Sequence, residues 1–172
     1  MERRQALKGI ALSLGSLASL PAWASSWQPS TLRATAYLST DYDALLAELV
    51  ETFIPKTDTL GAKDLGVHEF IQTMLKDCYT PKAQADFEKK LGEIGPLSIN
   101  TFGKPFAEGD TAQRLSVLKS LAESTDEETQ NFYKTLRGLT IKGYTSSEYF
   151  MTKFTDYEIA PARFYGCVSV KK

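Results

Sequence analysis

Two amphipathic segments separated by a proline constrain this chain more than any other feature of its sequence. Apolar residues recur at helical spacing over 45–54 and again over 67–78, so each segment carries one apolar face. Pro55 follows the first segment, and proline donates no backbone hydrogen bond and disfavours helix in the residue before it. The pattern predicts a helix that ends at Ile54, a polar loop, and a second helix over about 65–78, with both apolar faces in a core.

The rest of the chain continues this helical pattern. Further helices are predicted over about 81–94, 110–124, 126–142 and 146–154. We expect Gly95 and Pro96 to end the helix over 81–94 and to open a loop over 95–109, and Gly143 to end the helix over 126–142. Several predicted helices begin at or after residues that are preferred as N-caps, namely Thr40, Thr80, Asp110 and Asp126.

No segment shows the strict alternation of a β-strand, and no internal repeat is present. We therefore predict an all-α fold, a single compact domain of about five to seven helices over residues 40–172. A polar arm over 25–39 precedes it. The last residues, 155–172, are aromatic without a helical period, and we expect an irregular C-terminal tail that packs back on the helices.

Residues 1–24 have the three parts of an export signal. A basic start is followed by an apolar run that is too short for an ordinary transmembrane helix, so no direct membrane anchor is expected. Ala22 and Ala24 form the A-x-A pattern after which a signal peptidase cuts. The start, with Arg3 and Arg4, resembles the twin-arginine motif R-R-x-F-L-K, whose pathway carries folded proteins. A general secretory signal with two arginines by chance is the alternative.

Composition excludes several classes of protein. The net charge of the whole chain is −1, and because the charges of residues 1–24 sum to +2, those of the remaining residues sum to −3. The chain therefore lacks the excess of basic residues that is typical of a nucleic-acid-binding protein. One histidine and two cysteines cannot build a structural zinc site, and no metal site is expected. The chain has neither the glycine fingerprint of a dinucleotide-binding fold nor a haem-attachment C-x-x-C-H. We therefore predict no catalytic residue and no cofactor of its own.

A family resemblance runs through the predicted loop and second helix. The letters I-P-K-T-D-T-x-G-A over 54–62, G-V-x-x-F-I over 66–71 and D-C-Y over 77–79 resemble the gluconate 2-dehydrogenase subunit 3 family. The likeness extends to R-F-Y-G-C over 163–167 and so covers most of the chain after the signal. Leu60 departs from the pattern, because the family commonly has proline there.

The resemblance implies a noncatalytic small subunit and export escort of a periplasmic flavin-dependent dehydrogenase of the glucose–methanol–choline type. Such an enzyme oxidises a sugar or polyol, as a gluconate 2-dehydrogenase does. The implied partners are its large subunit, which would hold FAD, a cytochrome c subunit, and the twin-arginine translocase. The protein would reach the periplasm and meet the membrane through these partners. A stand-alone periplasmic helical binding module, with a pocket among its aromatic residues, is the alternative.

The loop, the second helix and the N-terminal arm are the surfaces that the resemblance assigns to the partner. The residues expected to take part are Pro55, Thr57, Asp58, Gly61, His68 and Tyr79. His68 could equally be a packing residue, and Asp58 could cap its own turn. A second candidate surface is aromatic, although each member could instead belong to the core: Tyr144, Tyr149, Phe150, Tyr157, Phe164 and Tyr165.

The two cysteines are interpreted as a disulfide, because the chain is expected to be exported. Cys78 falls on the apolar stripe of the second helix and Cys167 lies in the tail. A bond between them would close a loop of about 90 residues, which the chain-entropy view values at roughly 4–5 kcal/mol. Two separate buried thiols are the alternative.

Overall fold

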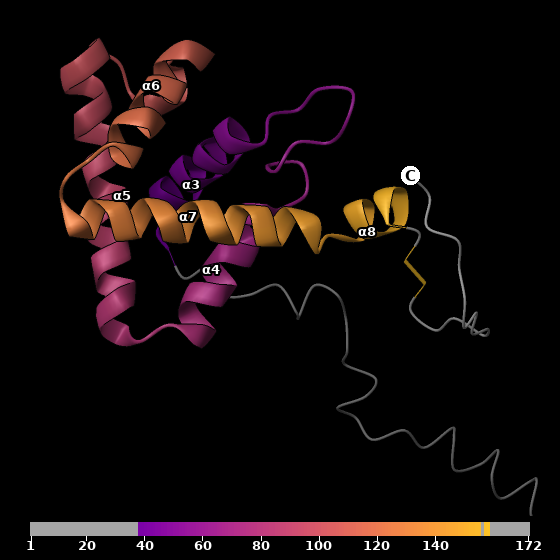
Figure 1. Cartoon of the computed structure of the whole chain (residues 1–172). Coiled ribbons are helices and arrows are strands. Elements are labelled where there is room, and N and C mark those ends of the chain that lie inside the picture. The colour runs from indigo at the N-terminus through magenta and orange to yellow at the C-terminus, as the bar shows by residue number, and fades with distance from the viewer. Residues whose placement is uncertain (1–37, 156, 159–172) are drawn as a thin grey trace, which may run out of the picture. The chain divides into compact units, whose positions relative to one another are not determined.

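The computed structural model describes residues 38–155, 157 and 158, which form six α-helices and one 3-10 helix, without a strand (Figure 1). In chain order they are α3 (Thr40–Phe53), α4 (Val67–Cys78), α5 (Pro81–Phe102), η1 (Phe106–Glu108), α6 (Thr111–Ala122), α7 (Glu127–Thr145) and α8 (Glu148–Phe154). The predicted all-α domain is confirmed. The predicted export signal, the predicted arm before Leu38 and the predicted tail from residue 159 lie outside the described residues. No helix in the described part has the length and apolar character needed to cross a membrane.

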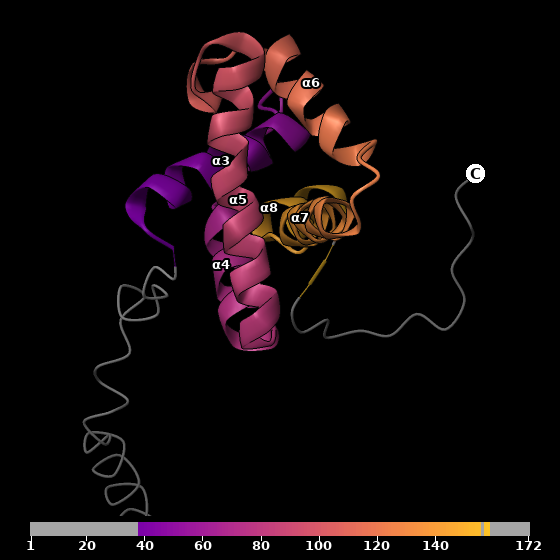
Figure 2. The same ribbon diagram turned by 90° about the vertical axis from the view of Figure 1, so that its left-hand side faces the viewer.

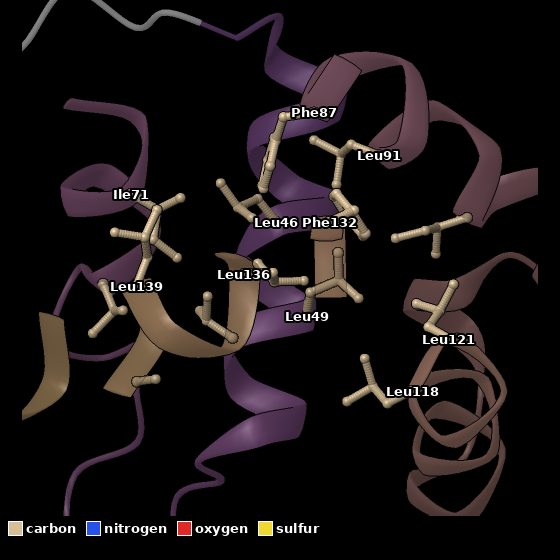
Figure 3. Close-up of a cluster of buried hydrophobic side chains, with 14 of the residues drawn as sticks. Leu46, Leu49, Ile71, Phe87, Leu91, Leu118, Leu121, Phe132, Leu136 and Leu139 are labelled. Carbon is tan, nitrogen blue, oxygen red and sulfur yellow. The ribbon is translucent and has the colours of Figure 1, made fainter. Parts of the chain in front are cut away.

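Helix α7 is central to the packing, because it contacts α3, α4, α5 and α6. Figure 2 views α7 nearly along its axis, with α5 passing beside it. Leu46 and Leu49 of α3, Ile71 of α4 and Leu136 of α7 are fully buried and meet in the core (Figure 3). Burying one such side chain contributes about 1.5–3 kcal/mol, so this cluster is what holds the helices on α7.

The predicted end of the third helix at Gly95 and Pro96 is wrong, because α5 continues through both residues to Phe102. A proline inside a helix removes one backbone hydrogen bond and costs about 3 kcal/mol. The buried face of α5 continues beyond that point, however, because Ile94 and Ser98 are both buried one turn apart. The helix ends instead at Gly103, whose φ of 70° suits glycine.

Gly143 was expected to stop α7, and this prediction is also wrong, since α7 runs on to Thr145. A Cβ atom on Gly143 would lie 2.7 Å from Phe70 Cδ1 and 3.0 Å from Val67 Cγ1, both on α4. Gly143 therefore lets α4 and α7 approach each other closely at this point.

Three of the four predicted N-caps are confirmed by hydrogen bonds from the helix backbone to the side chain of the cap. The side chains of Thr80, Asp110 and Asp126 all accept hydrogen bonds from backbone N–H groups in the first turns of α5, α6 and α7. At α3 the N-cap is Ser39, which makes no side-chain cap, and Thr40 is already helical. Three of the four helix starts thus follow directly from capping chemistry.

Candidate partner-binding surface

The loop between α3 and α4 has a closed base and an exposed tip. The backbone N–H of Ala62 donates to the carbonyl of Ile54 at 3.0 Å, and Ala62 is fully buried. Pro55, Thr57 and Asp58, which the sequence predicts as partner-binding residues, lie in the exposed tip. The loop therefore presents these side chains to solvent from a fixed base.

Glu51 organises the loop from the last turn of α3. Its carboxylate accepts from the backbone N–H of Lys56 at 2.8 Å and from that of Lys63 at 3.1 Å. Gly61 lies against the same carboxylate, and a Cβ atom there would stand 2.5 Å and 2.6 Å from its two oxygens. Gly61 is itself buried. Gly61 therefore does not contact a partner itself; because it has no side chain, it lets the loop pack against Glu51 and so supports the shape of the exposed tip.

Glu48, one turn before Glu51, ties the loop to α6. Its carboxylate accepts from Lys63 Nζ at 2.6 Å and from Arg114 Nη1 at 2.6 Å. Burial raises the pKa of Glu48, but the hydrogen bonds and charges of Lys63 and Arg114 outweigh it, and the net pKa lies below its ordinary value. Arg114 Nε also donates to the carbonyl of Gly109 at 3.0 Å, so one guanidinium links α3, α6 and the segment between α5 and α6.

Two further contacts hold the second half of the loop. Tyr144 of α7 donates its hydroxyl to the carbonyl of Leu60 at 3.0 Å. Lys56 Nζ lies 3.0 Å from Asp64 Oδ2, and its hydrogen bond holds the pKa of Asp64 below the usual value. Tyr144 is buried, so of the two alternatives left open for this residue the core holds and the exposed aromatic surface does not, and its role is to anchor the loop.

Helix α8 is an aromatic element that the core does not cover. None of its residues is buried, and its rings pack on one another, with centroids 5.2 Å apart for Phe150 and Phe154 and 6.0 Å apart for Tyr149 and Phe154. Phe154 is 53% exposed and Tyr157 is 49% exposed. Figure 1 shows α8 beyond the C-terminal end of α7, away from α5 and α6. An exposed aromatic surface of this kind is typical of an interface.

The loop and α8 share one surface. Asp64 and Leu65 of the loop line a shallow depression of about 540 Å³ together with Glu148 and Tyr149 of α8. The name loop–α8 surface is used below for exposed and half-buried side chains of the two segments that this depression joins, of which Tyr149 alone lines it: Pro55, Thr57, Asp58, Leu60, Tyr149, Phe154 and Tyr157.

His68, another predicted partner-binding residue, lies away from the loop tip, against the start of α3. Its Nε2 is 3.9 Å from Asp43 Oδ1, and its buried Nδ1 has no hydrogen-bond partner among the described residues. Gln72 joins the same site, because its Nε2 donates to Asp43 Oδ1 at 2.5 Å and its Oε1 accepts from the backbone N–H of Leu38 at 3.2 Å. This arrangement fixes the start of α3 on α4.

Tyr79 lies at the other end of α4, where its carbonyl accepts from Gln84 Nε2 at 3.0 Å. At 1.5 Å per helical residue, His68 and Tyr79 are separated by about 16 Å along the axis of α4. The structure therefore brings Pro55, Thr57, Asp58 and Gly61 together in one loop but does not gather all six predicted residues into one surface.

Cys78 is exposed at the last residue of α4, so the prediction that it faces the core is wrong. Leu75, one turn earlier, is the last fully buried residue of that helix. Cys167 lies outside the described residues, and the Cys78–Cys167 disulfide stays a prediction. Within the described residues, no group of three histidine, cysteine or acidic side chains could hold a metal ion.

Sequence reasoning missed the residues that hold the loop in place. Glu48, Glu51 and Arg114 stand in ordinary helical positions, and their charges resemble those of any solvated helix face. Only the packing of α3 beside α6 shows that they converge on the loop. The close approach of Gly61 to Glu51 likewise depends on tertiary structure, and the sequence indicated Gly61 only through the family resemblance of residues 54–62.

Comparison with known families identifies this architecture. A model of the family described as gluconate 2-dehydrogenase subunit 3 matches residues 41–161, which is more than half of the chain. The chain belongs to the gluconate 2-dehydrogenase subunit 3 family. The matched range contains the whole loop–α8 surface of this subunit 3 protein and all six described α-helices apart from the first residue of α3. No curated protein and no solved structure matched the chain.

Proposed function

We propose that this chain is a noncatalytic accessory subunit of a periplasmic flavin-dependent dehydrogenase of the glucose–methanol–choline type, such as a gluconate 2-dehydrogenase. In this proposal the large subunit holds FAD and oxidises the sugar or polyol, and a cytochrome c subunit accepts the electrons. The small subunit binds the large one and supports its folding. Membership of the subunit 3 family supports the assignment.

The observation that carries the proposal is the loop–α8 surface. Leu60, Phe154 and Tyr157 are 36%, 53% and 49% exposed, although burying such side chains would be favourable. The loop beside them is fixed in advance by Glu48, Glu51 and Tyr144. A surface that is ordered before binding loses less conformational entropy when a partner covers it. We therefore assign this surface to the large subunit.

The proposal has a second part, which is that this chain escorts the large subunit out of the cytoplasm, and the predicted export signal supports it. Arg3 and Arg4 begin a signal that resembles the twin-arginine type, whose pathway accepts folded cargo. A large subunit that has already folded around FAD could cross the membrane bound to this chain and use its signal. The small subunit would then act as the escort of its partner through the twin-arginine translocase.

The test follows the large subunit in the native host. Replacing both Arg3 and Arg4 with lysine should leave this chain and the flavin-bearing dehydrogenase in the cytoplasm, with dehydrogenase activity lost from the periplasm. The matched control is Lys8→Arg, which keeps the charge of the signal and both arginines. Normal periplasmic dehydrogenase activity in the double variant, with this chain retained inside, would overturn the escort role.

A further inference from the structure

A second concave site lies between α5, α6 and α7, with Tyr42 of α3 at its edge. Its volume is about 720 Å³, within the range of roughly 300–1,000 Å³ that is typical of small-molecule sites. None of the residues that line it belongs to the loop–α8 surface. We propose that this cavity binds an uncharged aromatic molecule that carries a hydrogen-bond donor.

The floor of the cavity is made of core residues. Ile94, Leu121 and Phe132 line it, and they are only 1%, 8% and 4% exposed. Pro96 and Leu97 of α5 extend the same apolar lining. A ring placed here would contact side chains that already belong to the hydrophobic core, so the favourable contact is with an apolar, flat group.

The requirement for a donor comes from the backbone of α5. Pro96 has no N–H, so the carbonyl of Gly92, four residues earlier, loses the donor that a regular helix would supply. Gly92 lines the cavity, and Tyr42 Oη lies 2.9 Å from the point that a Cβ atom on Gly92 would occupy. The Tyr42 hydroxyl has no hydrogen-bond partner among the described residues. An N–H or O–H of the ligand would therefore meet two oxygen acceptors at one edge of the cavity.

The charges around the cavity favour a ligand without charge. Lys90, whose side chain is 12% exposed, pairs with Glu93 at 3.2 Å and Asp126 at 3.1 Å. Lys89 pairs with Glu128 at 3.4 Å. Both lysines that line the cavity are thus already paired with carboxylates, and so is Glu93, the one acidic residue of the lining. An anion would have to compete with carboxylates for these lysines, and a cation would find no free carboxylate inside.

The probe that tests this is N-phenyl-1-naphthylamine, which is uncharged, aromatic, carries one N–H donor, and fluoresces more strongly in an apolar site. We expect the full chain to bind it with a stoichiometry of one. Ser120→Trp, which fills the cavity from α6, should weaken binding at least tenfold. Ser116→Trp, one turn earlier on α6 and outside the lining, should leave binding unchanged. Circular dichroism checks that both variants are folded.

Two further measurements keep the test decisive. Asn100→Trp fills the cavity from α5 and replaces Ser120→Trp if that variant does not fold. The sulfonated analogue 8-anilino-1-naphthalenesulfonate has a similar ring system with a negative charge and should bind at least tenfold more weakly. Unchanged probe binding in the filled variants, no binding at all, or tighter binding of the sulfonate would overturn the proposal. None of these outcomes bears on the large subunit, so the proposed function is tested separately.

Discussion

Tyr144 and Leu60 lie 84 positions apart in the sequence and are joined by one hydrogen bond, from the hydroxyl of the first to the carbonyl of the second, at 3.0 Å. Tyr144 stands near the end of α7, and its ring contacts Phe150 of α8 with a centroid separation of 5.8 Å. One buried side chain thus connects both halves of the loop–α8 surface.

Replacing Tyr144 with phenylalanine should loosen the loop without unfolding the domain. The change leaves the Leu60 carbonyl without its donor, and a lost hydrogen bond of this kind costs about 1 kcal/mol. Hydrogen exchange of the amides over 56–64 should accelerate, while that of α5 stays the same. Tyr149→Phe is the control, because no described residue pairs with the Tyr149 hydroxyl. Equal loop protection in both variants would contradict the anchoring role.

Gly143→Ala should destabilise the domain at the crossing of α4 and α7. The new methyl group would press on Phe70 and Val67 at 2.7 Å and 3.0 Å, and overpacking of this kind costs roughly 1–3 kcal/mol. Gly138→Ala in the same helix has no atom within 4 Å of its Cβ and should stabilise by about 0.5–1 kcal/mol. Urea unfolding of the two variants measures both changes. A Gly143→Ala variant as stable as Gly138→Ala would show that the helices can separate freely.

Acid should weaken the start of α7 through Asp126. Hydrogen bonds from Thr129, and then from Lys90, lower the pKa of Asp126 to about 2. Because the folded pKa lies below the unfolded one, the stabilisation is present above about pH 4 and is lost as the pH falls towards 2. The difference in unfolding free energy between the wild type and Asp126→Asn should therefore shrink over that interval.

The control for this pH dependence is Asp86→Asn, since Asp86 is exposed on α5 and forms no hydrogen bond or ion pair with a described residue. Its difference from the wild type should stay nearly constant with pH. A parallel pH dependence for the two variants would argue against Asp126 as the group responsible.

The aromatic half of the loop–α8 surface should decide affinity for the large subunit. Replacing both Phe154 and Tyr157 with alanine removes two exposed rings, and interface aromatics commonly contribute about 2 kcal/mol or more each. We expect binding to weaken at least a hundredfold with little loss of thermal stability. Leu115→Ala on α6, which removes a 42% exposed side chain elsewhere, should change nothing. Equal affinities would move the interface away from α8.

Local chemistry made part of this fold predictable. The caps at Thr80, Asp110 and Asp126 gave three helix starts, because their signal lies within four residues of the cap. The turn at Pro55 was predictable for the same reason. Pro96 shows the limit of such signals, since burial on both sides of it sustains α5 against the cost of the proline.

Cys78 and Glu51 show what the sequence does not contain. Cys78 lies on the same helical stripe as Val67, but the neighbouring helices cover α4 only as far as Leu75. Periodicity predicts the face of a helix on which a residue lies, but it does not predict how far along the helix that face is covered. Glu51 caps a loop through backbone N–H groups up to twelve residues away, and no pattern of residue types records that contact. The loop tip could therefore be predicted as a surface, whereas its support could not.

The most direct test of the accessory-subunit assignment is affinity purification of the tagged full-length protein from its native host, followed by mass spectrometry and an absorbance scan for flavin. We predict a stoichiometric large subunit of the glucose–methanol–choline type with the absorbance of bound FAD. A colourless, monomeric protein recovered without a large subunit would contradict the account.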